Sequence, residues 1–227
     1  TDAKMRNTKE SILEAQFTSG AGNWCTWMFG RDLVNWNNNF TWAKWVTPSR
    51  DLISAFKQEG DEVRFKESIV YYDCNWSNYY PSDNYPFMYK CRSANSSIIK
   101  YRYADVLLLK AEALIMQDTP DLEGAADIID EVRDRAKLGA LPTSVRSNKN
   151  AMLNALLKER RLELAFEGQR WFDLVRLDKV EEVMNAVYAK DSGRKAQIYT
   201  FDKNSYRLPI PQSVIDANDK IHQNPGY

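Results

Sequence analysis

The sequence predicts a mainly α-helical chain of helix hairpins, next to an aromatic-rich loop region that contains short β-strands. Two observations predict it. Aromatic residues, Asn and Ser are frequent up to about residue 98, whereas helical patterns dominate from residue 99 to about 190. Within that part, apolar residues recur at steps of three, four and seven, the spacing of one helix face. These residues are Leu153, Leu157, Leu164, Gly168, Trp171 and Val175.

The first 98 residues predict few regular elements. A helix is expected over 49–57, because Pro48 favours a helix start directly after it. Strand-like patterns are short and cover 12–17, 63–65 and 68–72. Residues 75–97 are rich in Ser, Asn, Asp and Pro, which is typical of a loop.

The helical part predicts two antiparallel hairpins. The first pairs a helix over 99–116 with one that has Thr119 as its N-cap, Pro120 at its first position and its end before Gly139. The second pairs 147–166 with 169–188, and 199–208 is a candidate strand pair. We therefore divide the chain into an aromatic-rich region (1–98), a helical scaffold (99–190) and an extended tail (191–227), which form one structural unit.

Charged residues crowd the segment from 157 to 176. Arg160 and Glu163, Glu167 and Arg170, and Arg170 and Asp173 are three positions apart, so opposite charges can meet on a helix surface. The planar guanidinium suits partly buried ion pairs better than lysine does. We interpret this segment as an ion-paired packing helix, part of the scaffold rather than of a functional site.

Composition excludes several classes of function. The chain has 227 residues, and 31 Lys and Arg balance 31 Asp and Glu. A neutral chain argues against binding nucleic acid through phosphate neutralisation. No apolar run approaches the roughly 20 residues of a membrane-spanning helix. The three cysteines have no metal-type spacing, and a bridge between Cys74 and Cys91 remains open.

Three segments carry a resemblance to a known family. They are KERRLELAFEGQRWFDLVR at 158–176, YRYADVLLLKAEA at 101–113, and the tail with YRLPIP at 206–211 and QNPGY at 223–227. Weaker matches lie at 10–17 and at 49–52, the latter with Asp61 and Arg64. Together they resemble the C-terminal half of SusD-like (SusD/RagB) nutrient-binding lipoproteins of Bacteroidetes.

The resemblance implies a fold and a role. It implies tetratricopeptide-like stacking of the helix hairpins, for which periodicity alone is weak evidence. It also implies non-catalytic binding of oligosaccharide at the extracellular face of the outer membrane, for delivery to a SusC-like TonB-dependent transporter. Any contact with the membrane would be through a lipid anchor on an N-terminal part absent from this chain.

Catalytic constellations are missing from the sequence. His222 is the only histidine and lies in the tail, and neither a zinc-protease motif nor a phosphate-binding loop occurs. Glu159, Glu163 and Glu167 have arginines nearby, which keep carboxylates ionised and do not suit a general acid. We therefore expect no enzyme, no cofactor and no metal site.

Aromatic residues form the candidate binding site. Five of the seven tryptophans lie between residues 24 and 45, interleaved with asparagines. An indole covers the apolar face of a sugar ring, while amides hydrogen-bond its hydroxyl groups. A second, Tyr-rich region contains Tyr71, Tyr72, Tyr79, Tyr80 and Tyr85. The candidate glycan-binding residues are Trp36, Asn37, Asn38, Trp42, Trp45, Trp24, Trp27 and Trp76.

Alternatives remain at this stage. RagB-type relatives handle peptides, so an aromatic, Asn-rich groove is also compatible with a peptide ligand. The same tryptophans are compatible with a loop-rich core, which would leave the helix hairpins as a protein-interaction module. A fluorescence response to oligosaccharides, to peptides or to neither separates these three functions.

Overall fold

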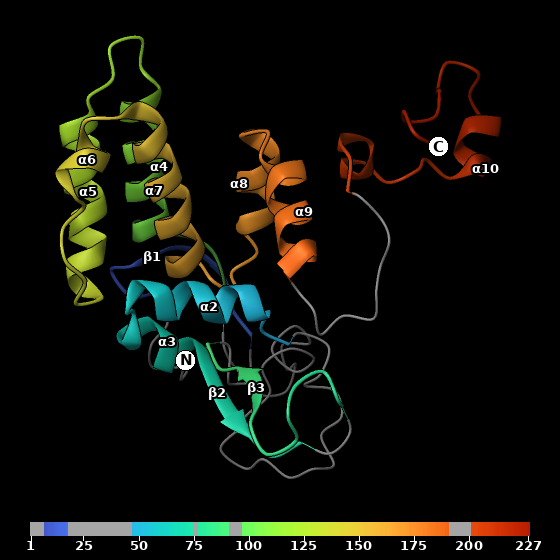
Figure 1. Cartoon of the computed structure of the whole chain (residues 1–227). Helices are drawn as coiled ribbons and strands as arrows, with labels where there is room; N and C mark the ends of the chain where they lie inside the picture. The colour runs from blue at the N-terminus through green and yellow to red at the C-terminus, as the bar shows by residue number, and fades with distance from the viewer. Residues whose placement is uncertain (1–6, 18–46, 75–76, 91–96, 191–200) are drawn as a thin grey trace. The chain divides into compact units, whose positions relative to one another are not determined.

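The computed structural model describes residues 7–17, 47–74, 77–90, 97–190 and 201–227 (Figure 1). The chain divides into two compact units, Thr1–Arg170 and Trp171–Tyr227. Helices dominate both, and the strands are few and short, so the predicted fold class is confirmed.

Three helices of the first unit form the scaffold: α4 (Tyr103–Met116), α5 (Leu122–Arg135) and α7 (Lys149–Glu163), with the short α6 (Thr143–Arg146) before α7 (Figure 1). All three helices contact one another. The hairpin of α4 and α5 is the first hairpin that the sequence predicts. The core of the scaffold consists of Leu108, Ala111, Ile115, Ala125, Ala126, Ile129, Val132, Leu141, Met152 and Leu156.

Two boundaries of the scaffold differ from the prediction. Helix α5 begins after Asp121 rather than after Thr119, because the Asp121 carboxylate accepts the backbone N–H of Gly124. Residues 98–102 form strand β4 (Ile98–Arg102), so the helix predicted from residue 99 begins at Tyr103. This strand pairs antiparallel with β1 (Ser11–Ala15), a long-range contact that local periodicity does not report.

A second part of the first unit holds α2 (Arg50–Glu59), α3 (Glu62–Ser68), β2 (Ile69–Tyr72) and β3 (Tyr85–Met88), and the two strands pair antiparallel. The strand predicted over 63–65 is wrong, because the Asp61 carboxylate accepts the backbone N–H of Arg64 and starts helix α3 there. The predicted loop 75–97 is wrong at β3, whose four residues are all buried.

The second unit contains α8 (Arg170–Arg176), α9 (Val180–Lys190), the 3-10 helix η4 (Lys203–Tyr206) and α10 (Gln212–Asp216). The helix predicted over 169–188 is two helices. Asp178 has a positive φ of 53°, and the N–H of Lys179 donates to the carbonyl of Leu174, which ends α8. Residues 201–208, part of the predicted strand pair, contain η4 and no strand.

Buried carboxylates on α7 join the scaffold to its surroundings. Arg64 of α3 donates to Glu159 at 2.6 Å and to Glu163 at 3.1 Å. Arg102 of β4 donates to Glu163 at 2.7 Å, and Arg133 of α5 donates to Glu159 at 3.3 Å. One helix is thereby linked by charge to three other elements, and we call these five residues the α7 network.

Burial and neighbouring charges shift the pKa values of Glu159 and Glu163 in opposite directions. Burial by itself raises the pKa of Glu163, but the charges of Arg102, Arg135 and Lys90 outweigh it and lower the pKa to about 2. Burial raises the pKa of Glu159, and the negative charge of Glu163 raises it further. Arg64 and Arg133 lower this pKa but do not outweigh the burial. Glu163 is therefore the carboxylate whose ionised form the fold stabilises.

Replacing Glu163 with Gln tests this network. At pH 7 we expect the free energy of unfolding to fall by about 3 kcal/mol, because buried arginines lose their counter-charge. The folded pKa lies below the unfolded value of 4.5, so the contribution is complete above pH 4.5 and disappears as the pH falls toward 2. Urea unfolding at pH 7 and at pH 3 measures this contribution. The difference in unfolding free energy between wild type and the variant should be about 2 kcal/mol smaller at pH 3 than at pH 7.

The matched control is Glu131→Gln, which removes the same charge from an exposed position on α5. Its unfolding midpoint is expected to equal that of wild type at both pH values. A Glu163→Gln variant that unfolds like this control would contradict a stabilising role for the α7 network.

Candidate functional site

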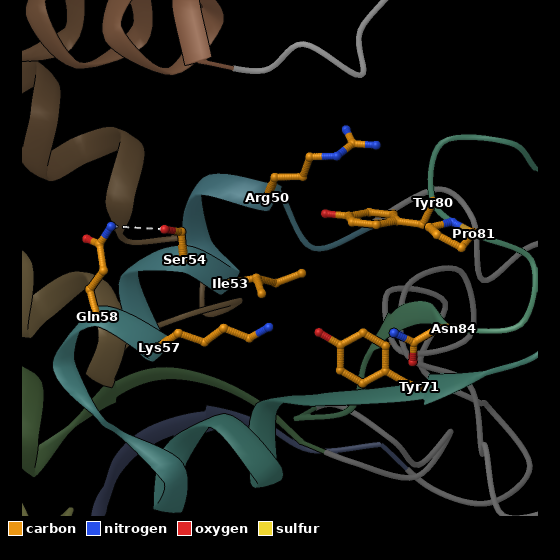
Figure 2. Close-up of a pocket in the computed structure, with 9 residues that line it drawn as sticks. All are labelled: Arg50, Ile53, Ser54, Lys57, Gln58, Tyr71, Tyr80, Pro81 and Asn84. Carbon is orange, nitrogen blue, oxygen red and sulfur yellow. Dashed lines mark hydrogen bonds between the residues drawn. The ribbon is translucent and has the colours of Figure 1, made fainter.

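A pocket of about 510 Å³ lies in the first unit, between α2, strand β2 and the segment 80–84 (Figure 2). Figure 2 shows the side chains of α2 on one side and two tyrosines, a proline and an asparagine on the other. The lining residues are Arg50, Ile53, Ser54, Lys57, Gln58, Tyr71, Tyr80, Pro81 and Asn84.

One face of α2 provides five of these residues. They stand at steps of three and four along the helix, and this spacing places them side by side on one face. The helix has defined ends: Ser49 accepts the backbone N–H of Leu52 at 3.1 Å, and Gly60, with a φ of 70°, closes the last turn. Phe56, only 1% exposed, packs into the core and fixes the rotation of α2.

Tyrosine rings form the opposite wall. Tyr80 donates its hydroxyl to the carbonyl of Pro48 at 2.7 Å, which ties the loop to the chain two residues before α2. Its ring meets those of Tyr79 and Tyr85 edge-to-face, with centroids 5.0 Å and 5.6 Å apart. Tyr71 stands on β2 and is half-buried.

Arg50 joins the two walls. Its guanidinium carbon lies 4.1 Å from the ring centroid of Tyr79 and 4.5 Å from that of Tyr80, within the range of a cation–π contact. It also donates a hydrogen bond to the backbone carbonyl of Tyr79. The loop that carries Tyr80 is therefore held against the first turn of α2.

The pocket offers groups for binding. Burial raises the pKa of Tyr71, so its hydroxyl remains protonated and can both donate and accept at neutral pH. Gln58 donates to the hydroxyl of Ser54 at 3.1 Å, and Asn84 adds a second amide. None of the nine lining residues is His, Cys, Asp or Glu. The arrangement provides ring faces, hydrogen bonds and positive charge, without the usual acid–base pairs.

The tryptophan and asparagine site lies outside the described residues. This applies to all eight candidates, which fall within 18–46 and 75–76: Trp24, Trp27, Trp36, Asn37, Asn38, Trp42, Trp45 and Trp76. Two members of the Tyr-rich region, Tyr71 and Tyr80, line the pocket. Tyr85 is instead 2% exposed and packs in a small core with Phe87 and Cys74, which has a free thiol.

Sequence reasoning missed the α2 face. The signal was present, because the polar residues Arg50, Ser54 and Lys57 recur at helical spacing within the segment 49–57 predicted as a helix, and Gln58 follows directly after it. What the sequence does not report is the wall opposite, which comes from residues 13 or more positions away and depends on the pairing of β2 with β3.

The described residues provide neither a metal site nor a membrane-spanning helix. Across 7–17, 47–74, 77–90, 97–190 and 201–227, no group of three or more His, Cys, Asp or Glu is placed to hold a metal ion. In the same ranges, no helix combines the length and the apolar character needed to cross a membrane.

Comparison with known proteins decides the family. The model of the SusD family matches residues 83–227, well over half of the chain. The chain belongs to the SusD family. Most residues that line the pocket precede residue 83, so the match covers the scaffold and the tail rather than the pocket walls.

Curated relatives agree with this assignment. SusD-like protein P38 of Formosa agariphila is 42% identical over 99 residues, which cover 41% of this chain and 19% of the relative. SusD-like protein P2 of the same organism is 35% identical over 143 residues, covering 60% of this chain and 27% of the relative. The matched segments thus span less than a third of either relative.

Solved structures share the fold. A SusD homolog from Bacteroides thetaiotaomicron has a TM-score of 0.74 at 22% identity, covering 96% of this chain and 52% of that chain. A laminarin-binding SusD-like protein has a TM-score of 0.65 at 25% identity, covering 99% and 51%. Surface glycan-binding protein A of B. thetaiotaomicron, in complex with laminarihexaose, has a TM-score of 0.67 at 19% identity, covering 95% and 52%. The chain spans about half the length of these structures.

Replacing Arg50 with Gln tests how the pocket is held together. The variant loses the charge over two rings and the donor to the Tyr79 carbonyl, so we expect the loop 77–84 to loosen. Hydrogen exchange of the backbone amides of 77–85 should be about tenfold faster than in wild type, while exchange in α4 is unchanged.

Lys57→Gln is the control, because it removes a positive charge from the same face of α2. Among the described residues, the Lys57 side chain has no hydrogen-bond or ion-pair partner. Its loop should exchange at the wild-type rate. Equal exchange in wild type and Arg50→Gln would show that the guanidinium does not hold the loop.

Proposed function

We propose that this chain binds oligosaccharide non-catalytically and that the α2 pocket is a contact site for the sugar. The observation that carries the proposal is the composition of the pocket in a chain of the SusD family. Tyr71 and Tyr80 offer ring surface for the apolar face of a sugar, and Gln58 and Asn84 offer amides for its hydroxyl groups.

Relatives support a carbohydrate ligand. One structure with the same fold is described as laminarin-binding, and another holds laminarihexaose. The pocket volume of about 510 Å³ falls within the ordinary range for small-ligand sites, roughly 300–1,000 Å³. The tryptophans and asparagines predicted from the sequence, from Trp24 to Trp45 with Trp76, remain proposed contributors to the same binding surface.

The cellular location of the protein and the delivery of its ligand form a separate proposal. We propose a place at the extracellular face of the outer membrane, where bound oligosaccharide passes to a SusC-like TonB-dependent transporter. Family membership supports this part. Co-purification of the protein with such a transporter would test this part separately from sugar binding.

A second candidate function, peptide binding of the RagB type, uses the same groups. Tyrosine rings and amides also suit an extended peptide. Polar lining on α2 favours sugar, because a peptide groove needs pockets for apolar side chains, and Ile53 and Pro81 are the aliphatic residues among the nine described lining residues.

Titration calorimetry with a panel of oligosaccharides tests the proposal. For the tightest ligand, Tyr71→Ala should weaken binding about tenfold through loss of ring stacking. Asn84→Ala should weaken it about fivefold through loss of a hydrogen bond. Asn84 is exposed, and the second variant therefore changes binding with little effect on folding.

Tyr101→Ala is the matched control, since Tyr101 is 54% exposed on β4 and is not among the residues that line the pocket. Its affinity should equal that of wild type. Sugar binding that is unchanged in all three variants would remove the α2 pocket from the binding site, and a response to peptides alone would favour the second function.

A further inference from the structure

The α2 pocket is positively charged in a chain whose formal net charge is zero. Arg50 and Lys57 line it, and none of the lining residues that the structure describes is acidic. The nearest acids along the sequence are placed elsewhere: Asp51 pairs with Arg161 of α7 at 2.5 Å, and Asp83 is exposed and is not among the lining residues. Among the described lining residues, positive charge is therefore in excess.

Lys57 is directed into the pocket. Its side chain leaves the exposed face of α2, and Figure 2 shows the ammonium pointing across the pocket toward the hydroxyl of Tyr71. The neighbouring acid on the same helix, Glu59, is paired with Arg133 and Lys158. Lys57 is exposed, and its ammonium is directed toward the hydroxyl of Tyr71, so a ligand in the pocket can reach it.

The two cations are spaced along the pocket. Arg50 and Lys57 are seven residues apart on one helix, so their backbones lie about 10 Å from each other along the axis. A single small anion does not span both. A chain that repeats its negative charges can approach both cations while its sugar rings lie on Tyr71 and Tyr80.

We propose that the α2 pocket selects negatively charged oligosaccharides, whose uronate carboxylates or sulfate esters contact Lys57 and Arg50. The inference rests on the proposed function and names the substrate class of that site. Lysine acts as a compact point charge that serves carboxylate and sulfate alike, and arginine suits planar bidentate pairing with carboxylate. The wall opposite accepts the sugar rings.

Calorimetry on the whole 227-residue chain tests the inference with four probes. Tetragalacturonate carries carboxylates, its methyl ester has the same backbone without charge, a carrageenan tetrasaccharide carries sulfate esters, and laminarihexaose is neutral. We expect one of the charged probes to bind at least tenfold more tightly than both neutral probes. Raising NaCl from about 50 to 500 mM should weaken that binding several-fold and leave neutral probes unaffected.

Lys57→Gln is the diagnostic variant. It should weaken the charged probe about tenfold and leave the methyl ester unchanged, because it removes one charge and keeps a polar side chain of similar length. Lys66→Gln on α3 is the control, since Lys66 is 73% exposed and pairs only with the exposed Glu62 among the described residues. This variant should bind every probe as wild type does.

Each outcome separates the two proposals. Equal binding of methyl ester and charged probes, unaltered in Lys57→Gln, would overturn charge selection while oligosaccharide binding stands. Binding of no probe by wild type, with binding of a Glu-rich peptide instead, would overturn both. The preference between galacturonate and the sulfated probe identifies which anion the pocket takes.

Discussion

The first unit depends on the buried charges of α7. Glu159 and Glu163 are almost fully buried, and each is held by arginines from other elements: Arg64 from α3, Arg102 from β4 and Arg133 from α5. A carboxylate in such a place is costly without its partners, so the elements that carry the arginines are obliged to stay in position. Helix α7, which the sequence predicts as part of an ion-paired packing helix, thus connects several elements through buried ion pairs.

The α7 network determines where the pocket lies. Arg64 lies on α3, which follows α2 after a turn of two residues, Gly60 and Asp61. Asp61 caps α3 and also receives the guanidinium of Arg64 at 2.5 Å. Ile53 and Phe56 then pack α2 against Leu162 and Ala165 in one small core. Charge and apolar contact therefore fix the same helix, whose outer face lines the pocket.

Local signals predicted much of this fold. The sequence predicts the α4–α5 hairpin from Thr119, Pro120 and Gly139 at the ends of its second helix, and α2 from Pro48 before it. The pairing of Arg160 with Glu163 is where local reasoning was incomplete: Arg160 reaches Asp105 of α4 at 2.9 Å, and Glu163 receives arginines from β4 and α3. Such partners are 55 to 99 residues away in sequence, and local spacing cannot report them. The pocket follows the same rule: α2 was predicted, but its opposite wall depends on the β2–β3 pairing.

Hydrogen exchange in an Arg64→Gln variant tests the central claim most directly. The claim is that the α7 network holds α2 and α3, and with them the pocket, to the helical scaffold. Amides of α2 and α3 should then exchange about tenfold or more faster than in wild type, while those of α4 and α5 keep their protection. Unchanged exchange in α2, or an equal rise in all helices of the first unit, would contradict the account.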